Sequence, residues 1–231
     1  LNQLLADKAI KYIANQKSAA PDKPFFLYLA TGATHSPHQV AKEWIDKYKG
    51  KFDFGWDKYR ESVLERQKKL GVIPANAILP PRNPGVKAWD SLSAKEKQAF
   101  AHFMEVYAAF YSYTDHEIGR IVNYLDQIDQ LDNTLIVLVL GDNGASKGGT
   151  QTGTVNEAIN QLKGEAKIDA ILKSRDIIGT DESNTDYPVG WAMAANTPFK
   201  YWKTDANSEG GTHSPLIIYY PKVIKDKGSV R

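Results

Sequence analysis

Apolar runs and helical periodicities alternate along this chain, and together they predict an α/β fold. Three apolar runs have the length and composition of strands: residues 25–30, 135–140 and 215–221. The run at 135–140 is uninterrupted, which is typical of a strand buried on both faces of a sheet. Amphipathic patterns predict helices over four stretches: 3–16, 40–49, 56–70 and 155–178. This alternation favours a largely parallel or mixed sheet flanked by helices.

The longest helical pattern covers residues 94–129, where apolar residues repeat at intervals of three and four. Ser93 and Glu96 have the spacing of a capping box at its start. The pattern is longer than a typical globular helix, so we expect a break near 115–119. Four prolines predict an irregular excursion over 71–92, and the stretch 192–200 is expected to form a short strand and turn.

Composition narrows the possible functions. The 231 residues are 42% hydrophobic, carry a net charge of +2 and suit one large domain or part of one. No basic block indicates nucleic-acid binding, and no apolar run approaches the roughly 20 residues that span a bilayer. There is no cysteine, which excludes disulfides, thiolate metal sites and a cysteine nucleophile within these residues. The first residues lack the pattern of a signal peptide, so we expect a cytosolic protein or a native start that lies upstream.

The most informative motif is the tetrapeptide 141–144, with the sequence Gly-Asp-Asn-Gly, directly after the apolar run 135–140. Open α/β sheets place their chemistry at the carboxyl ends of strands. There the side chains of Asp142 and Asn143 offer adjacent oxygen donors suited to a divalent cation. A plain strand-to-loop turn explains the same residues, because Asp, Asn and Gly are common in turns.

Other candidate residues also lie in loops. His35 follows the first predicted strand, a position where loops often carry function. Lys203 is either a surface lysine or a point charge that binds an oxyanion. The pair Gly210 and Gly211 predicts a turn that needs positive φ or close backbone approach.

Taken in order, these segments resemble the sulfatase family, and most closely the formylglycine-dependent bacterial arylsulfatases of the alkaline phosphatase superfamily. The resemblance is carried by four segments spanning almost the whole chain: the strand 25–30 with His35-Ser36-Pro37-His38, the helix 107–120, the strand 134–144 with its Asp-Asn pair, and 196–217 with its lysine and glycine turn. It implies a central mixed, largely parallel sheet flanked by helices, incomplete in this chain.

The resemblance also implies roles for particular residues. Asp142 and Asn143 would be two ligands of a calcium ion, or of magnesium as in some relatives. Lys203 would bridge a sulfate oxygen and the leaving-group oxygen, and His35 would hydrogen-bond the sulfate or the leaving oxygen. The substrate would be a small sulfate ester, and exported or periplasmic relatives are common. His213 stands where an arginine is often found, and no role is assigned to it.

Several elements of the family pattern are missing from these residues. There is no Cys-x-Pro-Ser-Arg motif to provide formylglycine, no Asp-Asp pair and no Lys-x-His element. We therefore expect residues 1–231 to be a single partial catalytic domain, without the nucleophile region and the C-terminal subdomain, and inactive alone. Missing strands would leave apolar surface uncovered, so we expect a complementary fragment or self-association.

Two other functions remain open. One is a phosphodiesterase or phosphonate monoester hydrolase of the same superfamily, which shares the aspartate-bearing metal strand. Asn143 favours a single-metal site, since a two-zinc site would usually carry Asp-His. The other is a scaffold that binds anions without turnover.

Overall fold

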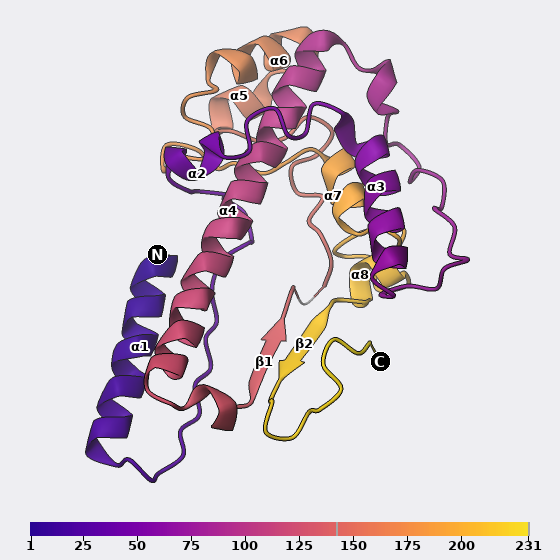
Figure 1. The fold of residues 1–231 in the computed structure, drawn as a ribbon. Helices are drawn as coiled ribbons and strands as arrows, with labels where there is room; N and C mark the ends of the chain where they lie inside the picture. The colour runs from indigo at the N-terminus through magenta and orange to yellow at the C-terminus, as the bar shows by residue number, and fades with distance from the viewer. Residues whose placement is uncertain (142, 231) are drawn as a thin grey trace.

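A computed structural model describes residues 1–141 and 143–230 of the chain (Figure 1). Its elements follow in this order: α1 (Asn2–Ala19), α2 (Lys42–Asp46), α3 (Gly55–Lys69), the 3-10 turn η1 (Trp89–Ser91), α4 (Ala94–Gln127), the 3-10 turn η2 (Leu131–Asn133), β1 (Ile136–Val139), α5 (Glu157–Gln161), α6 (Gly164–Lys173), α7 (Val189–Ala195), α8 (Glu209–Thr212) and β2 (Leu216–Tyr219). Among the described residues no helix is both long and apolar enough to cross a membrane.

The helix α4 forms the axis of the molecule, with α1 beside its C-terminal half, α2 near its middle and α6 near its N-terminal half (Figure 1). The predicted capping box is confirmed: the Ser93 hydroxyl accepts the N–H of Glu96, and the Glu96 carboxylate accepts the N–H of Ser93. The predicted break near 115–119 is wrong, because α4 continues without interruption to Gln127. Arg120 bridges Glu117 on its own helix and Asp7 on α1, which ties α4 to α1 across this stretch.

The larger core surrounds Trp191, which is fully buried. Its indole N–H donates to the carbonyl of Phe100 at 2.8 Å, and aromatic rings from α3 and the 71–92 excursion pack on it. Trp191 lies in α7, where the predicted short strand at 192–200 is wrong. Every residue from Val189 to Ala194 is buried, so this helix has no polar face and no period of 3.6 in its sequence.

The sheet is smaller than predicted and differs in topology. β1 and β2 pair antiparallel, with Val137 opposite Ile218 and Val139 opposite Leu216, and they form a sheet of two strands. The predicted largely parallel sheet is therefore not present among the described residues. β1 is also not buried on both faces, since its residues alternate between half-buried and exposed.

The predicted strand at 25–30 is extended but pairs with no strand among the described residues. Phe25, Leu27 and Leu29 pack against the smaller core between α1 and α4. Phe26 and Tyr28 point the other way and are 84% and 81% exposed. The apolar sequence is that of a strand covered on both sides, but the described residues cover only one side.

One face of the two-stranded sheet forms an uncovered apolar patch. The pairing register places Val137, Val139, Leu216 and Ile218 on the same face, and they are 53%, 58%, 56% and 51% exposed. Each strand also has one unpaired edge, which can bind another strand. Exposed contiguous apolar surface of this kind promotes association.

We expect the isolated 231-residue polypeptide to self-associate through this patch. The double variant Val137→Lys with Ile218→Lys is expected to shift the population towards monomer, measured by size exclusion with light scattering. A matched control, Leu70→Lys with Ile78→Lys, changes two residues that are exposed elsewhere, on the loop after α3. A stable monomer of the unmodified polypeptide would contradict the expectation.

Candidate active site

Two of the candidate residues meet although they are far apart in the sequence. The Lys203 ammonium lies 3.0 Å from Nε2 of His35. His35 is exposed on the loop that follows the extended segment 25–30, and Lys203 is half-buried on the loop between α7 and α8. The structure therefore brings these two predicted site residues together.

The contacts of His35 determine which ring nitrogen carries the proton. Nδ1 lies 2.7 Å from the carbonyl oxygen of Ser36, which can only accept a hydrogen bond. Nδ1 must therefore carry the proton, which leaves Nε2 as an acceptor for the Lys203 ammonium. The result is a directed chain of donors from Lys203 through His35 to Ser36.

The backbone of Lys203 is tied to the loop that follows β1. Its N–H donates to the carbonyl of Ala145 at 2.9 Å. Asn196 makes the second connection: its Oδ1 accepts the N–H of Ala145, and its Nδ2 donates to the carbonyls of Tyr201 and Gly210. Asn196 thus joins the loop after β1, the loop between α7 and α8, and the helix α8 through one amide, a role that its place in a turn sequence does not reveal.

Glycines allow these loops to approach backbone to backbone. A β-carbon on Gly144 would overlap the carbonyl oxygen of Gly210, and one on Gly210 would overlap the carbonyl oxygens of Lys200 and Tyr201. Gly210 and Gly211 lie in α8 without positive φ, so close approach, and not turn geometry, requires them. Gly144 needs both, since its φ is +80°.

The Lys203 loop is also strained. Tyr201 and Thr204 have φ values of 64° and 79°, in the left-handed region that non-glycine residues rarely adopt. Such conformations cost about 1–3 kcal/mol each and persist only where surrounding contacts enforce them. The contacts of Asn196 with Tyr201 and Gly210 provide that enforcement.

A buried acid lies beneath the His35 loop. Asp186 is 4% exposed, and its carboxylate accepts the N–H of Tyr187 at 2.9 Å, the N–H of Gly149 and the hydroxyl of Ser36. Burial raises the pKa of Asp186 from 3.8 to about 6, against the lowering effect of these donors and of His35. The sequence reasoning missed Asp186, because nothing in a polar loop marks one acid as buried.

His38 is the neighbour of Asp186 and is 2% exposed. Its ring packs against Tyr187 and Tyr107 at centroid distances of 5.2 and 5.0 Å, and its Nδ1 has no hydrogen-bond partner in the part of the chain that the structure describes. Burial lowers the pKa of His38 from 6.5 to about 3, so the ring is neutral near pH 7. Its Nε2 is 3.9 Å from the Asp186 carboxylate, which with a neutral ring is neither an ion pair nor a hydrogen bond.

The predicted metal ligands are Asp142 and Asn143. Asp142 lies outside the described residues. Asn143 is half-buried in the same loop, two residues before Ala145, which holds the Lys203 backbone. Among the described residues no group of three or more His, Cys, Asp or Glu side chains could hold a metal. Calcium needs about six to eight oxygen ligands, so the described residues do not fit this ion by themselves.

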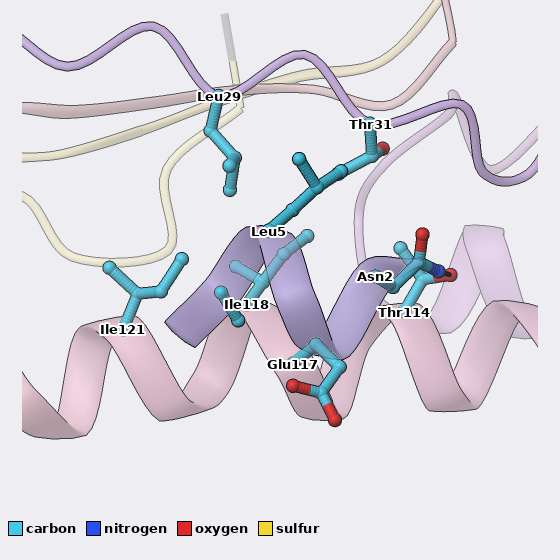
Figure 2. A pocket seen from close by; sticks show the side chains of 9 residues that line it. Asn2, Leu5, Leu29, Thr31, Thr114, Glu117, Ile118 and Ile121 are labelled. Carbon is cyan, nitrogen blue, oxygen red and sulfur yellow. Dashed lines mark hydrogen bonds between the residues drawn. The ribbon is translucent and has the colours of Figure 1, made fainter. Parts of the chain in front are cut away.

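The candidate site is not an enclosed cavity. One cavity of about 10 Å³ lies between α1, α4 and the segment that leads to Thr31, where Asn2 donates to Thr114 at 3.0 Å (Figure 2). Another of about 30 Å³ lies beside Trp56 and Phe100. Each has room for little more than water. His35 and Lys203 line neither of them and face the surface instead.

Comparison with known proteins decides the family. The model of the sulfatase family matches residues 1–230. The chain belongs to the sulfatase family. An uncharacterized sulfatase of Schizosaccharomyces pombe is 39% identical over 221 residues, which are 95% of this chain and 38% of that protein. An arylsulfatase of Klebsiella aerogenes is 29% identical over 210 residues, which are 90% of this chain and 43% of that protein.

A similar solved structure is the crystal structure of Ps i-CgsB in complex with k-i-k-neocarrahexaose. Its sequence is 19% identical, the match covers 96% of this sulfatase chain and 28% of that chain, and the TM-score is 0.46. The chain spans about two-fifths of the length of the curated sulfatases it matches. Family membership supports the predicted α/β class, whereas the described residues show only the antiparallel pair of β1 and β2.

His213, to which the sequence assigns no role, has contacts of its own. Its Nδ1 lies 2.6 Å from the Glu209 carboxylate, and its ring stacks on Phe199 at 4.8 Å. These contacts close α8 onto the start of the Lys203 loop and explain the residue without a catalytic role.

Proposed function

We propose that this chain supplies part of the active site of an arylsulfatase-type sulfate ester hydrolase. The contact between Lys203 and His35 carries the proposal, because it sets a cation and a proton-carrying group side by side at the surface. The family model and the arylsulfatase relative support the reaction class. The substrate proposed is a small sulfate monoester of an alcohol or phenol.

Lys203 and His35 suit the departure of an anionic leaving group. Sulfate oxygens only accept hydrogen bonds, so an ester that enters the site would replace the contact between the two side chains. The ammonium of Lys203 would then donate to a sulfate oxygen or to the bridging oxygen. The negative ester favours a proton on Nε2 of His35, and His35 could pass this proton to the departing oxygen.

The metal and the nucleophile are proposed to complete the site. Asp142 and Asn143 are proposed as two ligands of a calcium ion, with magnesium as the alternative, and other ligands would come from elsewhere in the protein. The metal would stabilise negative charge on the sulfate oxygens when bound. The nucleophile is proposed to be a formylglycine supplied from outside these 231 residues, which contain no cysteine.

We expect the product of the complete coding region to release 4-nitrophenol from 4-nitrophenyl sulfate, and the isolated 231-residue polypeptide to show no turnover. The comparison substrates are 4-nitrophenyl phosphate, bis(4-nitrophenyl) phosphate and a phosphonate monoester. A preference for the phosphate diester or the phosphonate would indicate a phosphodiesterase or phosphonate monoester hydrolase instead of a sulfatase. Binding of sulfate without turnover by the complete product would indicate a scaffold. Saturable turnover by the isolated polypeptide would contradict the proposal that parts of the site lie elsewhere.

A further inference from the structure

Three loops that build the candidate site meet at one buried carboxylate. Asp186 accepts the Ser36 hydroxyl from the His35 loop and the Gly149 N–H from the loop after β1. Its own loop is fixed by a backbone bridge in which Asp186 and Thr154 exchange N–H···O=C hydrogen bonds of 3.0 and 3.3 Å. This bridge fixes the backbone of Asp186 against that of Thr154.

The approach of the post-β1 loop to Asp186 depends on two glycines. A β-carbon on Gly148 would come within 2.8 Å of the Asp186 carboxylate, and one on Gly149 would overlap the carbonyl oxygen of Tyr187. Backbone contact this close leaves the Gly149 N–H free to reach the carboxylate. The glycines at 148 and 149 are thus explained by the acid that they approach.

Ser36 connects this carboxylate to the reactive end of the site. Its hydroxyl donates to Asp186, while its carbonyl oxygen accepts Nδ1–H of His35 at 2.7 Å. The same residue therefore receives its orientation from Asp186 and fixes the tautomer of His35. With Nδ1 protonated, Nε2 faces Lys203 as an acceptor.

We propose that Asp186 is a positioning residue of the sulfatase site, which orients His35 through Ser36 and anchors the post-β1 loop through Gly149. The inference rests on the proposed function for its effect on turnover. Its effect on the two loops does not depend on which reaction the site performs.

The ionised carboxylate is maintained at a cost to stability. Burial raises the pKa of Asp186 from 3.8 to about 6, so the folded state binds this proton more tightly than the unfolded state. The contribution to stability is complete below about pH 4 and is lost as pH rises through about 6.

The groups that face the carboxylate are those expected to influence its titration. His35 and His38 face it from the loop 31–38, Tyr107 from α4 and Tyr187 from its own loop. His38 is neutral near pH 7, and burial raises the pKa of both tyrosines above its ordinary value, so neither tyrosine changes charge near the pKa of Asp186.

The test is Asp186→Asn in the complete gene product, with aryl sulfate turnover measured from pH 5 to 9. We expect kcat to fall about 10- to 100-fold with little change in KM, the effect of losing hydrogen bonds to a charged group. The wild-type profile is expected to decline as pH falls through about 6, and the variant to lack that inflection. Its melting temperature at pH 7.5 is expected to be no lower than that of the wild type, since the amide carries no buried charge.

Two further variants separate positioning from general damage. Asp181→Asn removes the same charge from an exposed position of the same loop and is expected to change neither rate nor profile. The double variant of Asp186→Asn with His35→Ala is expected to be no slower than His35→Ala alone, because Asp186 acts through His35. Fully additive losses, or an unchanged rate in Asp186→Asn, would overturn the inference while leaving the sulfatase proposal intact.

Hydrogen exchange keeps the inference testable if the complete product lacks sulfatase activity. Amide exchange in 31–38 and 144–150 is expected to be faster in Asp186→Asn than in Asp181→Asn, because both loops lose their common anchor. Faster exchange without turnover in the wild type would support the positioning role and reject the proposed reaction. Equal exchange in the two variants would reject the positioning role.

Discussion

Replacing Lys203 with methionine is expected to lower kcat of the complete gene product by about 100- to 1,000-fold, the loss typical of removing one group that stabilises developing negative charge. Methionine keeps most of the length and volume of the side chain, so the change removes the charge and little else. The backbone contact of residue 203 with Ala145 does not depend on the side chain and should persist. The measurement is steady-state hydrolysis of 4-nitrophenyl sulfate.

The matched control is Lys200→Met, three residues earlier in the same loop. The ammonium of Lys200 lies 5.6 Å from the ring centre of Tyr201 and has no contact with His35 among its described interactions. Its loss is expected to change kcat less than threefold, within the range of exposed charge substitutions. Equal effects of the two substitutions would show that only the net charge of the loop matters. A Lys203→Met variant with normal kcat would remove Lys203 from the proposed mechanism.

The sequence predicted the strand β1 but not the sheet that contains it. The sequence of β1 is apolar throughout, whereas the described residues cover β1 on one side only. The same holds for Phe26 and Tyr28, which are apolar but lie in open solvent here. The apolar runs therefore predict β1 and β2 correctly but not the unpaired segment 25–30, and they do not reveal what covers a strand.

Helix prediction failed where burial was complete. The capping box at Ser93 marked the start of α4 because capping depends on local hydrogen bonds alone. α7 has no such marker, and its seven residues are apolar around the whole circumference. Amphipathic periodicity requires a polar face, so a fully buried helix gives the same signal as a short strand.

The sequence pointed to residues with reactive side chains as candidates, but it did not reveal the residues that position other groups. His35 and Lys203 are suited to proton transfer and anion binding, and their loops identified them. Asn196 and Asp186 act through hydrogen bonds to backbone and hydroxyl groups of residues distant in the sequence. Only the folded chain brings these partners together. The pair Gly210 and Gly211 is an intermediate case, since the sequence predicted close backbone approach there but not which residues lie against it.

Substituting Gly210 with alanine is expected to disrupt the Lys203 loop and to lower kcat at least 100-fold. The added β-carbon would overlap the carbonyl oxygens of Lys200 and Tyr201, which are backbone atoms and cannot rotate away. The loop must shift, and a displacement of about 1 Å at a catalytic group costs on the order of 100-fold in rate. Overpacking of this kind typically also destabilises the fold by about 1–3 kcal/mol, measurable by denaturant unfolding.

Gly119→Ala provides the matched control, since Gly119 also lies in a helix but has no atom within 4 Å of an added β-carbon. This substitution is expected to stabilise α4 by about 0.5–1 kcal/mol, because alanine loses less backbone entropy on folding, and to leave kcat unchanged. Both variants exchange a helical glycine for alanine, so the difference between them isolates the contact at Gly210. If Gly210→Ala retained full turnover, then backbone packing of α8 against residues 200–201 would not be what holds Lys203 beside His35.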